Sequence, residues 1–203
     1  MGSLLSHGYY WKTLLLGVVL QMFQQLVGIN SVIYYSTAIF HSAGMTNPAK
    51  ATIAVGLVNM LSTLIAVFCI DKVGRKRIMM IGLTLMMVTL LIGGGVFHYE
   101  ATLSTGNALP ELLKDTLLIA TVLYIVAFAF SSGPIVWVLC AEIFPLKGRD
   151  LGLTITTATN WIFAAFVVQF SLPIMTFADG SSNPMGGAHL FYFFALCCVI
   201  NMF

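Results

Sequence analysis

Amide side chains interrupt a long apolar stretch near the start of the chain, where residues 21–30 read QMFQQLVGIN. A buried side-chain amide without a partner costs about 2–7 kcal/mol, depending on the reference state. Each amide offers two N–H donors and a carbonyl acceptor. We therefore expect this stretch to bind either neighbouring helices or a ligand crowded with hydroxyl groups.

The spacing of these residues predicts a break in the helix that carries them. At about 100° per residue, Gln21, Gln24, Gln25 and Gly28 lie on one narrow face, whereas Asn30 lies on the opposite one. Glycine tolerates backbone conformations that other residues avoid, and interrupted helices surround midplane sites in many transporters. Either Asn30 has a separate role, or the helix unwinds near Gly28 and turns Asn30 toward the glutamines.

Two later stretches carry similar features. In SSGPIVWVLCAEIFP, the pair Gly133-Pro134 predicts a kink, and Trp137 follows one turn later. In TITTATNW, Asn160 and Trp161 follow a run of threonines. The π surface of a tryptophan suits the apolar face of a sugar ring. Amides and aromatics together predict a site for a polyol.

Hydrogen bonding between helices is the alternative for each of these polar side chains, because Ser, Thr, Asn and Gln often join membrane helices. This alternative is favoured for a single amide, such as Asn59 in the second apolar run. For Trp137, ordinary packing is an equal alternative. Three stacked glutamines are harder to explain in this way.

Composition places the chain in a membrane. Of its 203 residues, 59% are hydrophobic and 8% are charged, whereas a soluble domain carries about 25% charged residues. About 20 residues of apolar helix cross the hydrocarbon core, so six apolar runs predict an all-α integral membrane protein. The runs are 13–40, 50–70, 78–97, 116–142, 151–177 and 188–203. The last has 16 residues, and we expect it to be truncated and the chain to be a fragment.

Positive charges gather on one side of the predicted spans. Seven Lys and Arg residues lie before the first run and in the second and fourth loops, against two in the other loops. The positive-inside rule places the seven-residue side, and with it the N-terminus, in the cytoplasm. We expect a multi-pass protein of the cell (inner or plasma) membrane. The seven residues are Lys12, Lys72, Arg75, Lys76, Arg77, Lys147 and Arg149.

The sequence offers no chemistry for an enzyme, a metal ion or a cofactor. All seven acidic residues lie in loops or at the ends of runs, so a carboxylate for proton coupling at membrane depth must come from elsewhere. The cysteines form no CxxC pair and no zinc-type spacing with histidine. An intramembrane protease needs a nucleophile and a base at membrane depth, yet the four histidines lie at run ends or in loops. A nucleic-acid partner is not expected either.

Four segments together resemble one family: QQLVGINSVIYYSTAIF, DKVGRKR, GPIVWVLCAEIFPLKGR and TATNW. In this order and spacing they are similar to the sugar porters of the major facilitator superfamily, and most of all to the bacterial galactose–proton and arabinose–proton symporters. The resemblance covers about residues 9–177. Members of this family have two six-helix halves, and the resemblance is to the second. It therefore implies a six-helix half-bundle of the major facilitator fold over residues 1–203, with the N-terminal half absent.

The resemblance also implies roles for individual residues. Those that would bind the sugar are Gln24, Gln25, Asn30, Asn59, Trp137 and Asn160. Those that would line or gate the site are Gln21, Tyr34, Tyr35 and Trp161. A cytoplasmic charge network that would clasp when the inside is closed consists of Asp71, Arg75, Lys76, Glu142 and Arg149. Solvated charges that serve only as topology signals are the alternative for this last group.

The implied function is transport of a monosaccharide, a hexose or a pentose, across the lipid bilayer by alternating access. The complete protein would use H⁺ as its coupling ion, and the missing N-terminal half would be the partner of this chain. The alternative is a transport-incompetent fragment, or a half-unit that binds sugar only with a partner half. The particular sugar stays open, because galactose, arabinose, xylose and glucose would use nearly the same amides.

Overall fold

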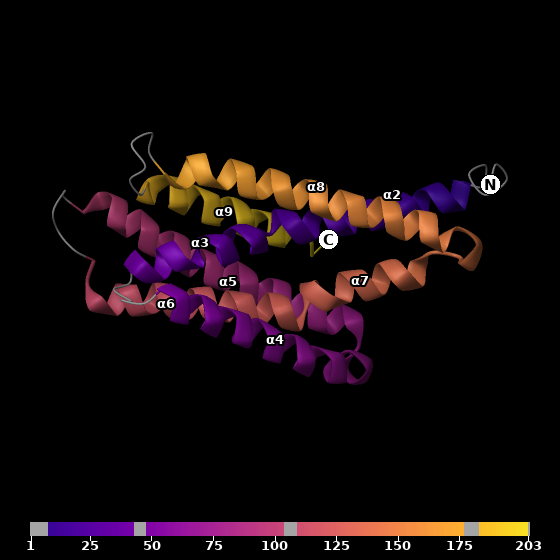
Figure 1. Cartoon of the computed structure of the whole chain (residues 1–203), viewed down its shortest axis with the longest axis horizontal. Coiled ribbons are helices and arrows are strands. Elements are labelled where there is room, and N and C mark those ends of the chain that lie inside the picture. Colours follow the sequence, from indigo (N-terminus) through magenta and orange to yellow (C-terminus); the bar gives the residue numbers. More distant parts are fainter. Residues whose placement is uncertain (1–7, 43–47, 104–108, 177–182, 203) are drawn as a thin grey trace.

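The computed structural model describes residues 8–42, 48–103, 109–176 and 183–202, and almost all of this part is helical (Figure 1). Within these ranges the helices form six consecutive apolar segments, which we call spans and of which five are long enough to cross a membrane. They are α2 (Gly8–Leu26), α3 (Ile29–Ser42), α4 (Pro48–Val73), α5 (Arg75–Thr102), α6 (Glu111–Phe130), α7 (Ser132–Ile143), the short 3-10 helix η1 (Leu146–Gly148), α8 (Arg149–Met175) and α9 (Pro184–Ile200).

Two of the six spans are interrupted helices. The first span consists of α2 and α3, which are separated at Gly28, where φ is +91°. The predicted break at this glycine is therefore confirmed. The fourth span consists of α6 and α7, separated at Ser131, where φ is −122° and ψ is −90°. This interruption lies just before Gly133-Pro134. Pro134 therefore falls in the first turn of α7, where its missing N–H removes no intrahelical hydrogen bond.

Five of the spans are long and apolar enough to cross a membrane. They are Tyr10–Tyr34, Ile53–Ile70, Arg75–Thr102, Glu111–Ile143 and Arg149–Met175. The helix α9 is apolar but has only 17 residues. These elements match the six apolar runs of the sequence, including the short last one.

The helices pack around a core that is centred on α5, α6 and α9. In this core α5 contacts both α6 and α9, while α2 lies along α8 and α4 lies along α6. Leu83, Leu90, Tyr124, Ile125 and Phe194 are almost fully buried there. The outer faces remain apolar, as on α4, where many large side chains are exposed. Such faces suit contact with lipid or with a further apolar protein surface.

The connections alternate between the two ends of the bundle. The turn at Gly74 and the segment 144–148 lie on the same side as the N-terminal end of α2 (Figure 1). These are the connections that carry most of the positive charge in the sequence. The fold therefore brings the basic connections together at one end, as the charge pattern requires.

Candidate functional site

Five amide side chains from α2, α3 and α8 form one continuous hydrogen-bond network. Four of them are buried, with exposed fractions between 0% and 6%, while Asn30 is half-buried. The members, which we call the amide network, are Gln21, Gln24, Gln25, Asn30 and Asn160.

Asn160 of α8 is the centre of the network. Its Nδ2 donates to Gln21 Oε1 at 2.6 Å and to Gln24 Oε1 at 2.8 Å. Its Oδ1 accepts from Gln25 Nε2 at 2.9 Å. One side chain thus uses both N–H groups and its carbonyl to join α8 to three positions of α2. The three glutamines share a helix face, as their spacing predicts.

The break at Gly28 brings Asn30 to the glutamines. Asn30 Nδ2 donates to Gln25 Oε1 at 2.7 Å, across the interruption between α2 and α3. On a continuous helix these two residues would point about 140° apart. The structure therefore supports the second of the two alternatives for Asn30, in which the helix unwinds and the amides meet.

The network also reaches the second interrupted span. Gln24 Nε2 donates to the backbone carbonyls of Ser132 and Gly133, at 3.0 and 2.9 Å. Gln21 Nε2 lies 3.7 Å from the sulfur of Cys140, also in α7. Hydrogen bonds thus connect both helix breaks to the same set of amides.

Some polar residues near the network carried no signal in the sequence. Ser31 and Ser171 share a hydrogen bond of 2.6 Å that joins α3 to α8. The hydroxyl of Ser132 is buried and has no hydrogen-bond partner among the described residues. Isolated serines are common in membrane helices, so only the packing of the helices singles these out.

The predicted aromatic residues lie outside the network. Trp137 of α7 is 40% exposed, Trp161 of α8 is 66% exposed and Tyr34 of α3 is 67% exposed. The side chain of Tyr35 lies outside the described residues. The exposed rings leave aromatic surface available at three helices, while four of the five network amides are buried.

Asn59 of α4 is half-buried and separate from the other amides. Its side chain makes no hydrogen bond among the described residues, and its backbone carbonyl accepts from the Thr63 hydroxyl at 2.9 Å. The structure therefore does not bring this predicted residue together with the amide network.

Two cavities lie elsewhere in the bundle. One, of about 380 Å³, is between α2, α8 and α9, with Phe170, Ser171 and Phe194 among its lining residues. The other, of about 480 Å³, lies between α2, α5, α7 and the end of α9. No amide of the network lines either cavity. Each amide of the network has at least one hydrogen-bond partner among the described protein groups.

One ion pair forms within the predicted charge network. Arg75 Nη2 at the start of α5 lies 2.6 Å from Glu142 Oε1 near the end of α7, with side chains 41% and 47% exposed. Lys76 is exposed and Arg149 is half-buried, and neither has a described ion pair; the side chain of Asp71 lies outside the described residues. An ion pair this exposed contributes at most about 1 kcal/mol to the free energy of unfolding. It nevertheless connects the start of α5 to the end of α7.

The His, Cys, Asp and Glu side chains, which are the common metal ligands, do not cluster in the described part of the chain. No group of three or more His, Cys, Asp or Glu side chains lies close enough together there to hold a metal ion. The four cysteines are free thiols.

The amino-acid sequence is similar to those of known sugar transporters. The family model described as "Sugar (and other) transporter" matches residues 1–203. The chain is 36% identical to the galactose-proton symporter of Escherichia coli K12 over 192 residues, 93% of this chain and 38% of that protein. It is 40% identical to the arabinose-proton symporter of the same strain over 156 residues, 74% of this chain and 32% of that one. It is also 37% identical to the facilitated trehalose transporter of Aedes aegypti, over 94% of this chain and 22% of that protein.

Solved structures resemble the fold closely. The proton:xylose symporter XylE, bound to 6-bromo-6-deoxy-D-glucose, is 31% identical with a TM-score of 0.74, over 93% of this chain and 38% of that one. The inward open conformation of XylE from E. coli gives a TM-score of 0.71 at 30% identity, over 94% of this chain and 37% of that one. The chain thus spans well under half the length of the proteins that it matches.

Proposed function

Because the chain belongs to the sugar (and other) transporter family, a family of multi-pass membrane transporters and not of enzymes, we propose that it is the second six-helix half of a monosaccharide transporter. In the complete protein this half and a further six-helix half would rock about a central sugar site, so that the site opens to each side of the membrane in turn. This mechanism is called alternating access. The similarity to symporters over 38% of their length is consistent with this division.

The observation that carries the proposal is the amide network at the junction of two interrupted helices. Five amides hold each other through hydrogen bonds of 2.6–2.9 Å. Exchange of one hydrogen bond for another of similar quality costs little net free energy. A sugar, whose hydroxyls both donate and accept, can therefore replace amide–amide bonds when the network opens.

The proposed sugar contacts follow from this arrangement. Gln24, Gln25, Asn30 and Asn160 would bind hydroxyl groups, with Gln21 beside them. Trp137 is 40% exposed and lies about one helical turn beyond Gly133, whose carbonyl accepts from Gln24. Its ring would therefore cover the apolar face of the same sugar. The remaining proposed contact is Asn59, and Tyr34, Tyr35 and Trp161 would line or gate the site.

Proton coupling and orientation complete the proposal. We infer that H⁺ is the coupling ion, because proteins named as galactose-proton and arabinose-proton symporters are among the relatives. The coupling carboxylate would lie in the other half, since this chain has its acidic residues in loops or at run ends. The basic connections and the N-terminus would face the cytoplasm, with the pair Arg75–Glu142 closing that side.

Uptake measurements test the proposal. The complete gene product that contains this chain is expressed in bacteria that lack their own hexose and pentose carriers, and entry of labelled galactose, arabinose, xylose and glucose is followed. We expect concentrative uptake of at least one sugar, with alkalinisation of the medium. Uptake of none of these sugars by a correctly inserted protein would contradict the proposal, and uptake without proton movement would contradict the coupling.

The same experiment on the 203-residue chain alone separates the second candidate, a half-unit that needs a partner. Because the amides are enclosed and the aromatics exposed in this half, we expect no uptake by the chain alone and restored uptake when the remaining part of the gene product is co-expressed.

A further inference from the structure

The break between α2 and α3 frees a backbone carbonyl inside an apolar core. In a continuous helix the Val27 carbonyl would accept from the N–H four residues later. Here the first backbone bond across the break runs from the Val32 N–H to the Gly28 carbonyl, at 3.0 Å. The Val27 carbonyl accepts instead from the hydroxyl of Tyr124 in α6, at 2.7 Å. In hydrocarbon no water is available to donate a hydrogen bond to this carbonyl. The Tyr124 hydroxyl therefore supplies the hydrogen bond that the interrupted helix lacks.

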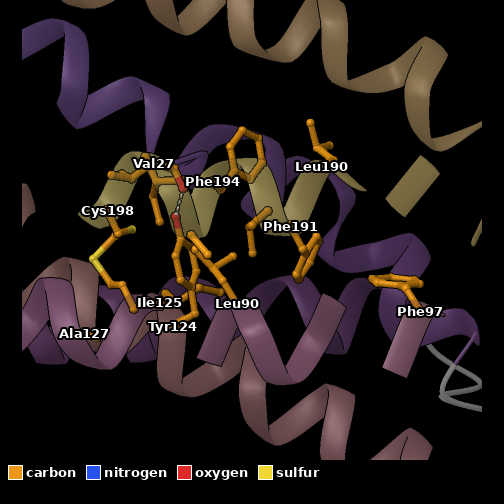
Figure 2. Close-up of a cluster of buried hydrophobic side chains, with 14 of the residues drawn as sticks. Val27, Leu90, Phe97, Tyr124, Ile125, Ala127, Leu190, Phe191, Phe194 and Cys198 are labelled. Carbon is orange, nitrogen blue, oxygen red and sulfur yellow. Dashed lines mark hydrogen bonds between the residues drawn. The ribbon is translucent and has the colours of Figure 1, made fainter. Parts of the chain in front are cut away.

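A second side chain fixes the break from the other side. A Cβ atom on Gly28 would lie 2.2 Å from Cδ2 of Phe194 in α9. The phenylalanine ring therefore packs directly on the glycine backbone. Figure 2 shows Phe194 beside Val27, with the hydrogen bond from Tyr124 as a dashed line. The break is thus held by α6 and by α9 at once.

Tyr124 cannot touch a ligand in this arrangement. It is 1% exposed and belongs to the same buried cluster as Leu90 and Ile125. Figure 2 shows it within this cluster, with its hydroxyl turned to Val27. Its hydroxyl is linked to the amide network through the backbone at Val27, three residues before Asn30.

We propose that Tyr124 is a positioning residue, which holds the α2–α3 break open through the Val27 carbonyl and thereby holds Asn30 against Gln25. Without the hydroxyl, this carbonyl gains a partner when α2 and α3 join into one helix, since the Ser31 N–H then reaches it. Joining the helices turns Asn30 about 140° away from Gln25. The link to sugar binding rests on the proposed function; the link to the helix break does not.

The variant Tyr124→Phe removes one oxygen atom and keeps the ring. Tyr192→Phe is the matched control, because Tyr192 of α9 is 36% exposed and packs on Gly94 of α5, away from the break between α2 and α3. Both are made in the complete gene product and checked for folding by size-exclusion chromatography and circular dichroism. Spin labels at Leu16 of α2 and Tyr34 of α3, both at least half exposed, report the distance across the break in detergent.

Sugar affinity is then measured on each variant without spin labels, so that Tyr34 is intact, both alone and together with Asn30→Ala. We expect Tyr124→Phe to shift or broaden the label distance and to weaken sugar binding about tenfold. We expect its effect on affinity to disappear in the Asn30→Ala background, since mutations that act through one residue are not additive. Tyr192→Phe should change neither quantity.

Two results would overturn the inference. One is an unchanged label distance in folded Tyr124→Phe, and the other is a loss of affinity that is equally large with and without Asn30. If the label distance changes but the unmodified protein binds no sugar, the proposed function fails while the role of Tyr124 at the break stands.

Discussion

At the scale of single residues, Asn160 joins α8 to α2 through three hydrogen bonds, to Gln21, Gln24 and Gln25. Hydrogen bonds between membrane helices contribute about 0.6 kcal/mol each on average. Three of them amount to about 2 kcal/mol, which makes Asn160 important to stability as well as to the proposed site.

Replacement of Asn160 by leucine should therefore destabilise the complete protein by about 2 kcal/mol, because three glutamines lose a partner inside the bundle. The matched control is Asn59→Leu, since the Asn59 side chain is half-buried and makes no described hydrogen bond; a change below about 0.5 kcal/mol is expected there. Unfolding in detergent, followed by fluorescence, measures both. An equal loss of unfolding free energy in the two variants would show that the hydrogen bonds of Asn160 do not stabilise the protein.

At the scale of elements, the interrupted spans decide what the amides can do. The two breaks differ in kind: at Gly28 the backbone has a positive φ and a ring packed on it, while at Ser131 φ stays negative. The first break therefore depends strictly on glycine, and the second depends on Pro134, which keeps α7 from continuing α6.

A series of glycine replacements separates backbone strain from crowding. Gly28 and Gly74 share a φ near +90°, but a Cβ at Gly74 meets nothing within 4 Å. Gly74→Ala should cost about 1–3 kcal/mol from strain alone, whereas Gly28→Ala should cost more and abolish uptake, because Phe194 must also move. Gly56→Ala, in the middle of α4 and also in open space, should be neutral or stabilising by about 1 kcal/mol. Chemical denaturation gives the order; a Gly28→Ala protein as stable as Gly74→Ala would show that the contact with Phe194 is unimportant.

The elements were largely predictable from the sequence, and the contacts between them were not. Apolar run length predicted the six spans, and the 100° spacing rule predicted the break at Gly28. The partner of each amide depends on how α8 packs on α2, more than a hundred residues away in sequence, and no local pattern contains that information. Tyr124 lies in an apolar run whose nearest polar residue, Thr121, bonds only to the backbone of its own helix among the described residues, so the bond from Tyr124 to Val27 appears only in the folded chain.

At the scale of the whole molecule, the chain is one bundle whose polar groups are turned inward to each other and whose aromatic residues Trp137, Trp161 and Tyr34 are exposed. In the proposed transporter a second bundle would cover part of this surface, and the sugar would enter between the two.

The pair Arg75–Glu142 joins α5 and α7 at the end of the bundle where the basic connections lie. If it closes the cytoplasmic side, Glu142→Arg should slow uptake severalfold without preventing sugar binding, and the exchanged pair Arg75→Glu with Glu142→Arg should restore most of it. Initial uptake rates at low salt provide the measurement. Failure of the exchanged pair to recover any activity would argue against this contact as a closing device.

Equilibrium binding of labelled sugar to the purified complete protein shows whether the amide network binds the sugar. Gln25→Leu is compared with Gln169→Leu, the same change at an exposed position of α8. We expect Gln25→Leu to weaken binding at least tenfold, because it removes bonds to both Asn30 and Asn160, and Gln169→Leu to leave the affinity unchanged. Equal affinity in the two variants, with both proteins folded, would contradict this expectation.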